Sequence, residues 1–124
     1  MARASTFELK NAYPGRVVLL CAFKPNDTSA PTLLVGDGVA KVARTGIGVH
    51  VITLDDKYYG LYASGTLNKA SGAAGYLVGC VCSASAKTVT VTFTTETGTA
   101  TDVTGGTNDS CVVTIWAEQG PALS

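Results

Sequence analysis

Two segments with the pattern of β-strands constrain the fold of this chain more than any other feature of its sequence. Thr88–Thr95 reads TVTVTFTT, with an apolar residue at every second position, and residues 111–118 read CVVTIWAE. Because successive side chains of a strand point to opposite faces, the first pattern predicts one face on a core and one face that is wet or lightly covered. Within the second segment, residues 111–116 are apolar on both faces except at Thr114, which predicts a central strand or a strand covered by a partner.

Similar runs recur along the chain at short, even spacing with turn-forming residues between them, as in a sandwich or barrel. We predict strands over residues 6–10, 16–23, 32–35, 39–44, 48–54, 59–67, 76–84, 88–97 and 111–118. No window has a convincing apolar period of 3.6 residues, and only 55–59 could form a single helical turn. The sequence therefore predicts an all-β, antiparallel β-sandwich or jelly-roll-like barrel of about eight to nine strands over residues 13–124, after an N-terminal arm at 1–12.

The connections between these runs carry specific turn chemistry. Residues 36–38 (Gly-Asp-Gly) offer the positive φ that a tight turn needs, and a second turn is expected at Thr45-Gly46. The connection at 85–87 is short enough for a hairpin between its flanking strands. The segment 98–109 is the one long polar loop, where contacts with a partner are expected to concentrate.

Charge and composition exclude several classes of function. Nine basic and nine acidic residues are spread along the chain without a cluster, which argues against nucleic-acid binding and against a polybasic membrane segment. Only 15% of the residues are charged, well below the usual quarter. Either part of the surface is buried against a neighbour, or Thr, Ser and Gly supply the polarity instead. The N-terminal residues lack the apolar region of a secretory signal, so we expect synthesis in the cytoplasm.

Four cysteines lie in apolar, strand-like runs: Cys21, Cys80, Cys82 and Cys111. Cys80 and Cys82 are two residues apart and should share one face of a strand. Their spacing differs from the C-x₂₋₄-C turn of a two-thiolate metal site. The pattern predicts buried, free thiols in a reducing compartment.

Residues suited to catalysis or metal binding are few. His50 is the single histidine, and its segment supplies no serine or cysteine nucleophile beside it, so we interpret it as a packing residue at a surface or interface. Oxygen ligands for a metal could come from Asp37, Asp55, Asp56, Asp102 and Asp109. These acids lack the spacing of a calcium loop, and we predict no metal, no cofactor and no enzymatic activity.

Aromatic residues offer one alternative function. Tyr58, Tyr59, Tyr62 and Trp116 could form a flat platform for sugar rings, because aromatic faces suit the apolar face of a sugar. Two of these tyrosines flank Gly60, an arrangement that equally suits the packing of a corner. An adhesin-type or tail-fibre module that recognises host glycans therefore remains an alternative.

The sequence from Val39 onward resembles small virion proteins of tailed bacteriophages. It reads VAKVARTGIGVHVITLDDKYYGLYASGTL and continues later as TVTVTFTTETGTATDVTGGTNDSCVVTIWAEQ. The hairpin motif of that group is matched by Arg44, Thr45, Gly46, Gly48, His50, Ile52, Thr53, Leu54, Asp56 and Tyr58. The N-terminal third matches no motif.

The resemblance implies a capsid decoration (cement) or head-fibre-like β-sandwich on the capsid surface. Such a protein would bind itself, as a trimer rather than a dimer, and the major capsid protein, without nucleic acid or membrane. The arm at the N-terminus would be a plausible attachment segment. Candidate interface residues are Phe7, Leu9, Tyr13, His50, Tyr58, Tyr59, Tyr62 and Trp116.

Overall fold

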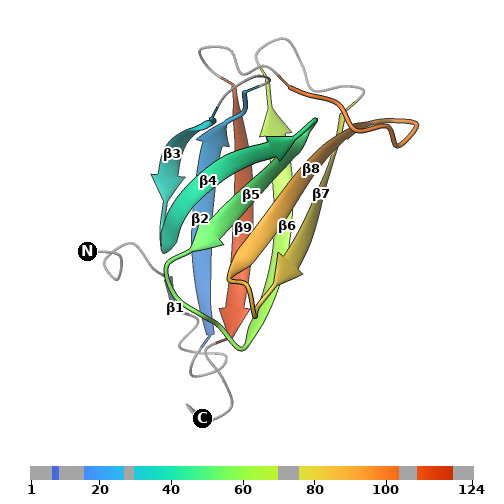
Figure 1. Ribbon diagram of the computed structural model, residues 1–124. Helices are drawn as coiled ribbons and strands as arrows, with labels where there is room; N and C mark the ends of the chain where they lie inside the picture. The colour runs from blue at the N-terminus through green and yellow to red at the C-terminus, as the bar shows by residue number, and fades with distance from the viewer. Residues whose placement is uncertain (1–6, 9–15, 27–29, 70–75, 104–108, 119–124) are drawn as a thin grey trace.

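A computed structural model of the protein describes residues 7–8, 16–26, 30–69, 76–103 and 109–118, which form two antiparallel β-sheets packed face to face (Figure 1). The strands are β1 (Phe7–Glu8), β2 (Arg16–Lys24), β3 (Thr32–Gly36), β4 (Val39–Gly46), β5 (Val49–Leu54), β6 (Gly60–Asn68), β7 (Tyr76–Ser83), β8 (Thr88–Thr95) and β9 (Ser110–Glu118). No helix occurs in these residues. The predicted all-β fold is confirmed, as a sandwich rather than a closed barrel.

The first sheet has the order β1-β2-β9-β6, and β3 pairs with β2 beside β1. The second sheet has the order β4-β5-β8-β7. Strand β9 lies between β2 and β6 over its whole length, with Val113 opposite both Cys21 and Gly65. This placement confirms the central strand that the two-sided apolar pattern of residues 111–116 predicted.

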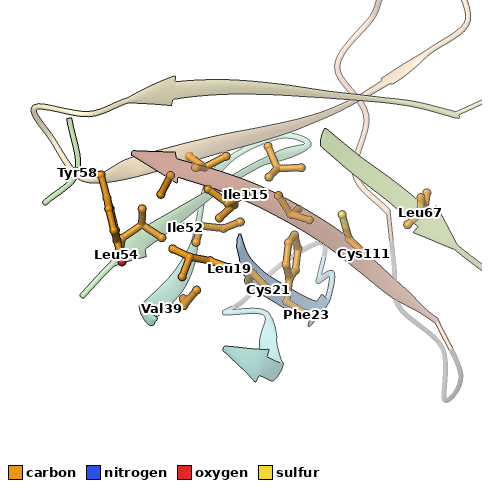
Figure 2. Packing of buried hydrophobic residues seen from close by; sticks show 14 of the residues in the cluster. Leu19, Cys21, Phe23, Val39, Ile52, Leu54, Tyr58, Leu67, Cys111 and Ile115 are labelled. Atoms are coloured by element: carbon orange, nitrogen blue, oxygen red, sulfur yellow. The ribbon is translucent and has the colours of Figure 1, made fainter. Parts of the chain in front are cut away.

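The core lies between the two sheets and is filled by alternate residues of the facing strands (Figure 2). On β8, Val89, Val91 and Phe93 are fully buried, while the threonines between them point away. Ile115 and Leu19 meet them from the first sheet, and both are also fully buried. Each large apolar side chain buried in this way contributes about 1.5–3 kcal/mol, which is why the alternation of the sequence selects this pairing.

The observed turns follow glycine chemistry, with one shift from the prediction. Gly38 has a φ of 73°, as expected for the turn between β3 and β4. The turn between β4 and β5 is formed by Ile47 and Gly48, two residues later than predicted, because the positive φ belongs to Gly48 (68°). Lys87, with a φ of 61°, closes the predicted hairpin between β7 and β8.

The helical turn considered for residues 55–59 is wrong. The backbone N–H of Asp55 donates to Gly38 O at 2.9 Å, and that of Tyr59 donates to Glu118 O at 2.6 Å. Donors that are bonded to other parts of the fold cannot close a helical turn, so this segment bends between the two sheets instead.

The described part of the long polar loop is tied to β8. Thr95 N donates to Thr99 O at 2.9 Å, Thr101 N donates to Phe93 O at 3.0 Å, and Val103 is buried in the core. Residues 98–103 are therefore an ordered extension of the sheet rather than a freely reaching loop. Leu9, Tyr13 and most of the predicted arm lie outside the described residues, whereas the backbone of Phe7 and Glu8 pairs with β2.

Candidate functional site

His50 lies inside the sandwich and not at its surface. Its side chain is 0% exposed and lies between the rings of Phe23 and Phe93, at centroid distances of 5.2 and 5.4 Å. Burial, aided by the positive charge of Arg44, lowers the pKa of His50, and the opposing influences of Asp102 and the backbone of Asn26 are smaller. Its ring nitrogens make no hydrogen bond of good geometry within the described residues. The imidazole is a neutral core group, which corrects its placement at a surface or interface.

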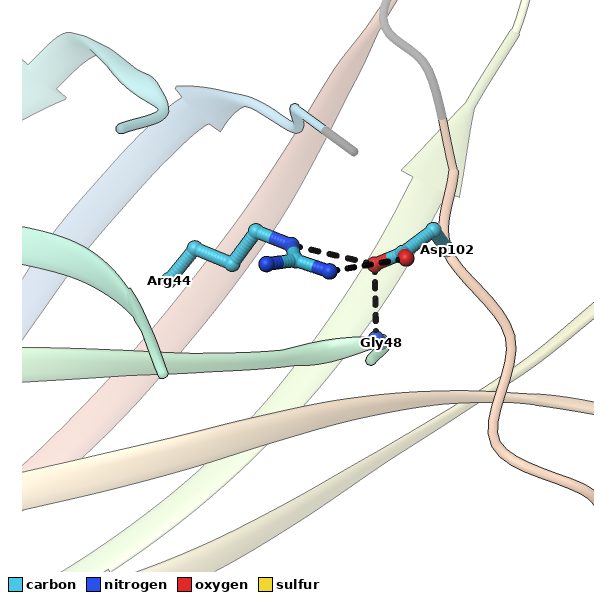
Figure 3. Close-up of polar contacts among 3 residues, drawn as sticks. All are labelled: Arg44, Gly48 and Asp102. Atoms are coloured by element: carbon cyan, nitrogen blue, oxygen red, sulfur yellow. Dashed lines mark hydrogen bonds and ion pairs between the residues drawn. The ribbon is translucent and has the colours of Figure 1, made fainter. Parts of the chain in front are cut away.

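A group of strong polar contacts near His50 joins Arg44, Asp102 and Gly48 (Figure 3). Arg44 donates from Nε to Asp102 Oδ1 at 3.2 Å and from Nη2 to Oδ2 at 2.8 Å. The backbone N–H of Gly48 donates to the same Oδ1 at 2.8 Å. These donors, the Arg44 hydrogen bond first, hold the pKa of Asp102 below its usual value.

This constellation is an architectural clamp. The bidentate guanidinium and the Gly48 amide occupy the carboxylate, and His50 behind them is closed to solvent. A catalytic acid–base pair needs a group that can reach a substrate and exchange a proton. The clamp instead fastens the segment that follows β8 to the turn between β4 and β5.

The other acidic candidates for metal binding do not converge either. Asp109 pairs with Lys69, whose Nζ lies 3.2 Å from Oδ2, and both side chains are largely buried. Asp37, Asp55 and Asp56 lie on turns of the chain. No group of three or more His, Cys, Asp or Glu side chains suited to a metal ion occurs among the described residues.

All four cysteines are free, in agreement with the prediction. Cys21 and Cys111 are fully buried, and burial raises the pKa of each thiol to about 12. Cys80 and Cys82 share the inner face of the edge strand β7, as their spacing predicted, but they are only half-buried. Burial also raises the pKa of these two thiols.

An aromatic pocket lies on the outer face of the first sheet. Trp116 (43% exposed) on β9 is directly opposite Tyr62 (60% exposed) on the edge strand β6. In the next row, Arg16 lies opposite Glu118, and the closest nitrogen–oxygen distance of this ion pair is 3.7 Å. The pocket has a volume of about 280 Å³ and is lined by Arg16, Val17, Tyr62, Trp116, Ala117 and Glu118.

The tyrosines that the sequence grouped as one platform are separated by the fold. Tyr58 is buried in the core, which removes it from the candidate surface residues. Tyr59 is 67% exposed but does not line the aromatic pocket. Only Tyr62 and Trp116 come together. The sequence analysis missed Arg16 and Glu118, although both occupy the solvent-facing positions of their strands.

A second outward surface covers the second sheet and carries no charged side chain on β5, β8 or β7. We call it the threonine face, and it consists of Val49, Val51, Thr53, Leu77, Gly79, Val81, Thr88, Thr90, Thr92 and Thr94. Val81 is 68% exposed, and Leu77 is exposed as well. Lys41, opposite Thr53 on the edge strand β4, lies at its border.

The edge strand β3 is a further exposed apolar feature that the sequence analysis did not single out. Leu33, Leu34 and Val35 are all exposed, because β3 lies beyond β2 at the rim of the first sheet. Unpaired edges of this kind are potential pairing surfaces for another chain.

No family model matches the chain, and comparisons with curated proteins and with solved structures find no significant match. Among the described residues there is no helix of the length and apolarity needed to cross a membrane.

Proposed function

We propose that this protein is a structural, non-enzymatic subunit that associates with copies of itself and decorates a larger protein shell, as capsid decoration proteins of tailed bacteriophages do. The threonine face is the observation that carries the proposal. An outward sheet surface without charge on three adjacent strands suits contact with protein better than exposure to water.

Desolvation favours this surface as an interface. Burying a charged side chain costs several kcal/mol unless it is paired, whereas a threonine hydroxyl needs a single hydrogen-bond partner. Alternating Thr and Val side chains on β5 and β8 supply such hydroxyls beside apolar contacts. Another copy of the chain can therefore cover this surface without burying a charged side chain of β5, β8 or β7.

The dimensions of the sheet also fit an interface of modest size. Four strands spaced about 4.8 Å apart, each about eight residues long, give a flat footprint of roughly 400–500 Å². Two surfaces of this size would bury a total area that approaches the lower limit for stable interfaces, about 1,200 Å², because projecting side chains add to the flat footprint. In a trimer this surface would pack against a different surface of the next copy, because contact between two identical surfaces gives a two-fold dimer; such a ring would match the three-fold symmetry that a shell lattice offers.

The non-enzymatic part of the proposal rests on the clamp and on His50. The single histidine of the chain is buried in an aromatic environment, and the acid nearest to it is held by Arg44 and Gly48. This arrangement suits a stable scaffold.

The proposal is tested by the mass of the protein in solution and by a matched pair of variants. Sedimentation at micromolar concentration should give an oligomer, and Val81→Glu should shift it toward the 12.6 kDa monomer. Ile47→Glu is the control, because Ile47 is comparably exposed (62%) but lies in the turn between β4 and β5. A wild-type monomer, or equal effects of the two variants, would refute association through the threonine face.

Shell binding is tested by co-sedimentation with empty shells of a tailed-phage major capsid protein, taken from the genome that encodes this chain. We expect the wild-type protein to pellet with the shells in a saturable ratio. A protein that stays in the supernatant at every concentration would refute the decoration role. Truncation of the predicted arm, residues 1–10, then tests whether the arm attaches the protein to the shell.

A further inference from the structure

We propose that the aromatic pocket on the first sheet is a binding site for a single uncharged sugar ring. This inference goes beyond the proposed structural role and rests on different residues, on the opposite outer face of the sandwich.

The two aromatic side chains lie on the same face of the sheet and line one pocket. Trp116 and Tyr62 are opposite residues on paired antiparallel strands, so their Cβ atoms lie about 4.5–5.5 Å apart on one face of the sheet. Both rings remain substantially exposed, although aromatic side chains gain the most from burial. A flat ligand with an apolar face would cover both rings at once.

The adjacent row of the sheet supplies the polar groups. Arg16, Glu118 and Gly60 lie opposite one another on β2, β9 and β6. The Glu118 carboxylate accepts hydrogen bonds and the Arg16 guanidinium donates them, so this row offers the two kinds of group that bind vicinal hydroxyl groups. Their closest approach of 3.7 Å is longer than a direct hydrogen bond.

Gly60 leaves this polar row open at the edge of the sheet. A Cβ atom at this position would lie 3.3 Å from Glu118 Oε1 and 3.7 Å from the ring and hydroxyl of Tyr62. A side chain at this position would press on the Glu118 carboxylate and would lie in van der Waals contact with Tyr62. The missing side chain keeps both groups accessible from the side of β6.

Charge and size select the ligand class. Among the lining residues one side chain is positive, Arg16, and one is negative, Glu118, so the lining favours neither an anion nor a cation. A volume of about 280 Å³ is just below the ~300–1,000 Å³ of pockets for drug-sized ligands, which fits one ring rather than an extended chain. A pyranose combines an apolar C–H face with a rim of hydroxyl groups, and it matches both rows of the pocket.

The test uses methyl glycosides of glucose, galactose, mannose and N-acetylglucosamine as probes. Trp116 is the only tryptophan of the chain, so its fluorescence reports the pocket directly. We expect saturable quenching by at least one glycoside, with a Kd on the order of 1 mM for a ligand of this size. Glycerol at equal concentration controls for a solvent effect.

Variants separate the pocket from its surroundings. Tyr62→Ser and Glu118→Gln should each weaken binding by about tenfold, through the lost ring contact and the lost charged acceptor respectively. Tyr59→Ser is the matched control, since it removes an exposed tyrosine next to the pocket, and it should leave the Kd unchanged. Saturation-transfer NMR extends the test to Trp116→Leu, in which binding should be lost.

Three results would overturn the proposal: no saturable response to any glycoside, equal quenching by glycerol, or equal weakening by Tyr59→Ser and Tyr62→Ser. The outcome is separate from that of the structural role, because Val81→Glu on the threonine face should leave glycoside binding intact. Wild-type protein that binds a glycoside but stays monomeric would refute the structural role alone, and wild-type protein that self-associates but binds no glycoside would refute the sugar site alone.

Discussion

Replacing Gly48 by alanine should destabilise this protein more than the same change at Gly38 or Gly98, the other described glycines with a positive φ. Gly48 has a φ of 68°, and a Cβ atom there would lie 2.5 Å from Thr101 O and 2.7 Å from Phe93 O. Both contacts are with backbone atoms, which cannot rotate away as a side chain would. The turn between β4 and β5 would have to move away from β8.

The expected cost follows from the hydrogen bonds at this position. Displacing the turn strains the bond from Phe93 N to Gly48 O (2.8 Å) and the one from Thr101 N to Phe93 O (3.0 Å). It also strains the bond from Gly48 N to Asp102. At about 1 kcal/mol for each neutral bond and about 1.5–3 kcal/mol for the charged one, the loss is about 3–5 kcal/mol. This is a large share of the ~5–15 kcal/mol that stabilises a typical domain.

Gly98→Ala is the matched control. Gly98 also has a positive φ, 90°, but nothing lies within 4 Å of its Cβ position. Its alanine variant therefore bears the backbone strain alone, roughly 1–2 kcal/mol, reduced by the lower entropy of the unfolded chain. Urea unfolding followed by Trp116 fluorescence measures both variants. If Gly48→Ala lies within about 1 kcal/mol of Gly98→Ala, the clash and the clamp contribute little and this reasoning is wrong.

The remaining predictions concern the core, the thiols and the pH dependence. Phe93→Ala should cost about 3–5 kcal/mol in urea unfolding, and a loss below about 1 kcal/mol would contradict its place in the core. Thiol titration should find four free thiols in unfolded protein, while Cys21 and Cys111 react very slowly in the native state because their pKa values are raised to about 12. The lowered pKa of Asp102 contributes stability that is present above about pH 4 and lost as the pH falls through its folded-state pKa. The free energy of unfolding of Asp102→Asn should therefore depend less on pH in this acid range. The lowered pKa of His50 should likewise make stability fall as the pH drops below about 6.5, where only the unfolded state takes up the proton, and His50→Leu should remove this component without a large loss at neutral pH.

Strand alternation accounts for most of what could be predicted from the sequence. The pattern around Val91 and Phe93 places both in the core, and the two-sided apolar character of β9 places it at the centre of the first sheet. Both inferences depend on a local period of two residues, which the sequence shows directly. The pairing of β9 with β2 and β6 brings together segments far apart in the chain, and local patterns carry no information about such partners.

The sequence did contain the signal that places His50 in the core. Ile52 and Leu54 follow it at steps of two, so an inward Ile52 puts His50 on the same inner face. We predicted a surface position for His50 because its side chain is polar, although its place in the alternation of the strand puts it on the inner face. Arg44 lies opposite His50 on the same face and brings its charge to the end of the core, where Asp102 compensates it.

The alternation of inward and outward positions also explains why Trp116 and Tyr62 come together, whereas Tyr58 and Tyr59 do not join them. On β9, Ile115 and Ala117 are buried, so Trp116 between them must face outward, and its register partner Tyr62 faces the same way. No such relation links Tyr58 and Tyr59, which lie before β6 begins. The strand pairing, and not the composition, therefore rules out a platform formed by all four aromatic residues.

The placement of the two proposed surfaces makes them compatible in one molecule. The aromatic pocket lies on the outer face of the first sheet and the threonine face on the outer face of the second, with the core between them. Self-association through the second sheet would leave the pocket of each copy open, and an oligomer would present several pockets. Since single sugar rings bind weakly, linked pockets would raise the avidity for a surface that carries many sugars, without any new contact. A multivalent glycan polymer should therefore bind the wild-type oligomer more tightly than the Val81→Glu variant, whereas a methyl glycoside should bind both equally.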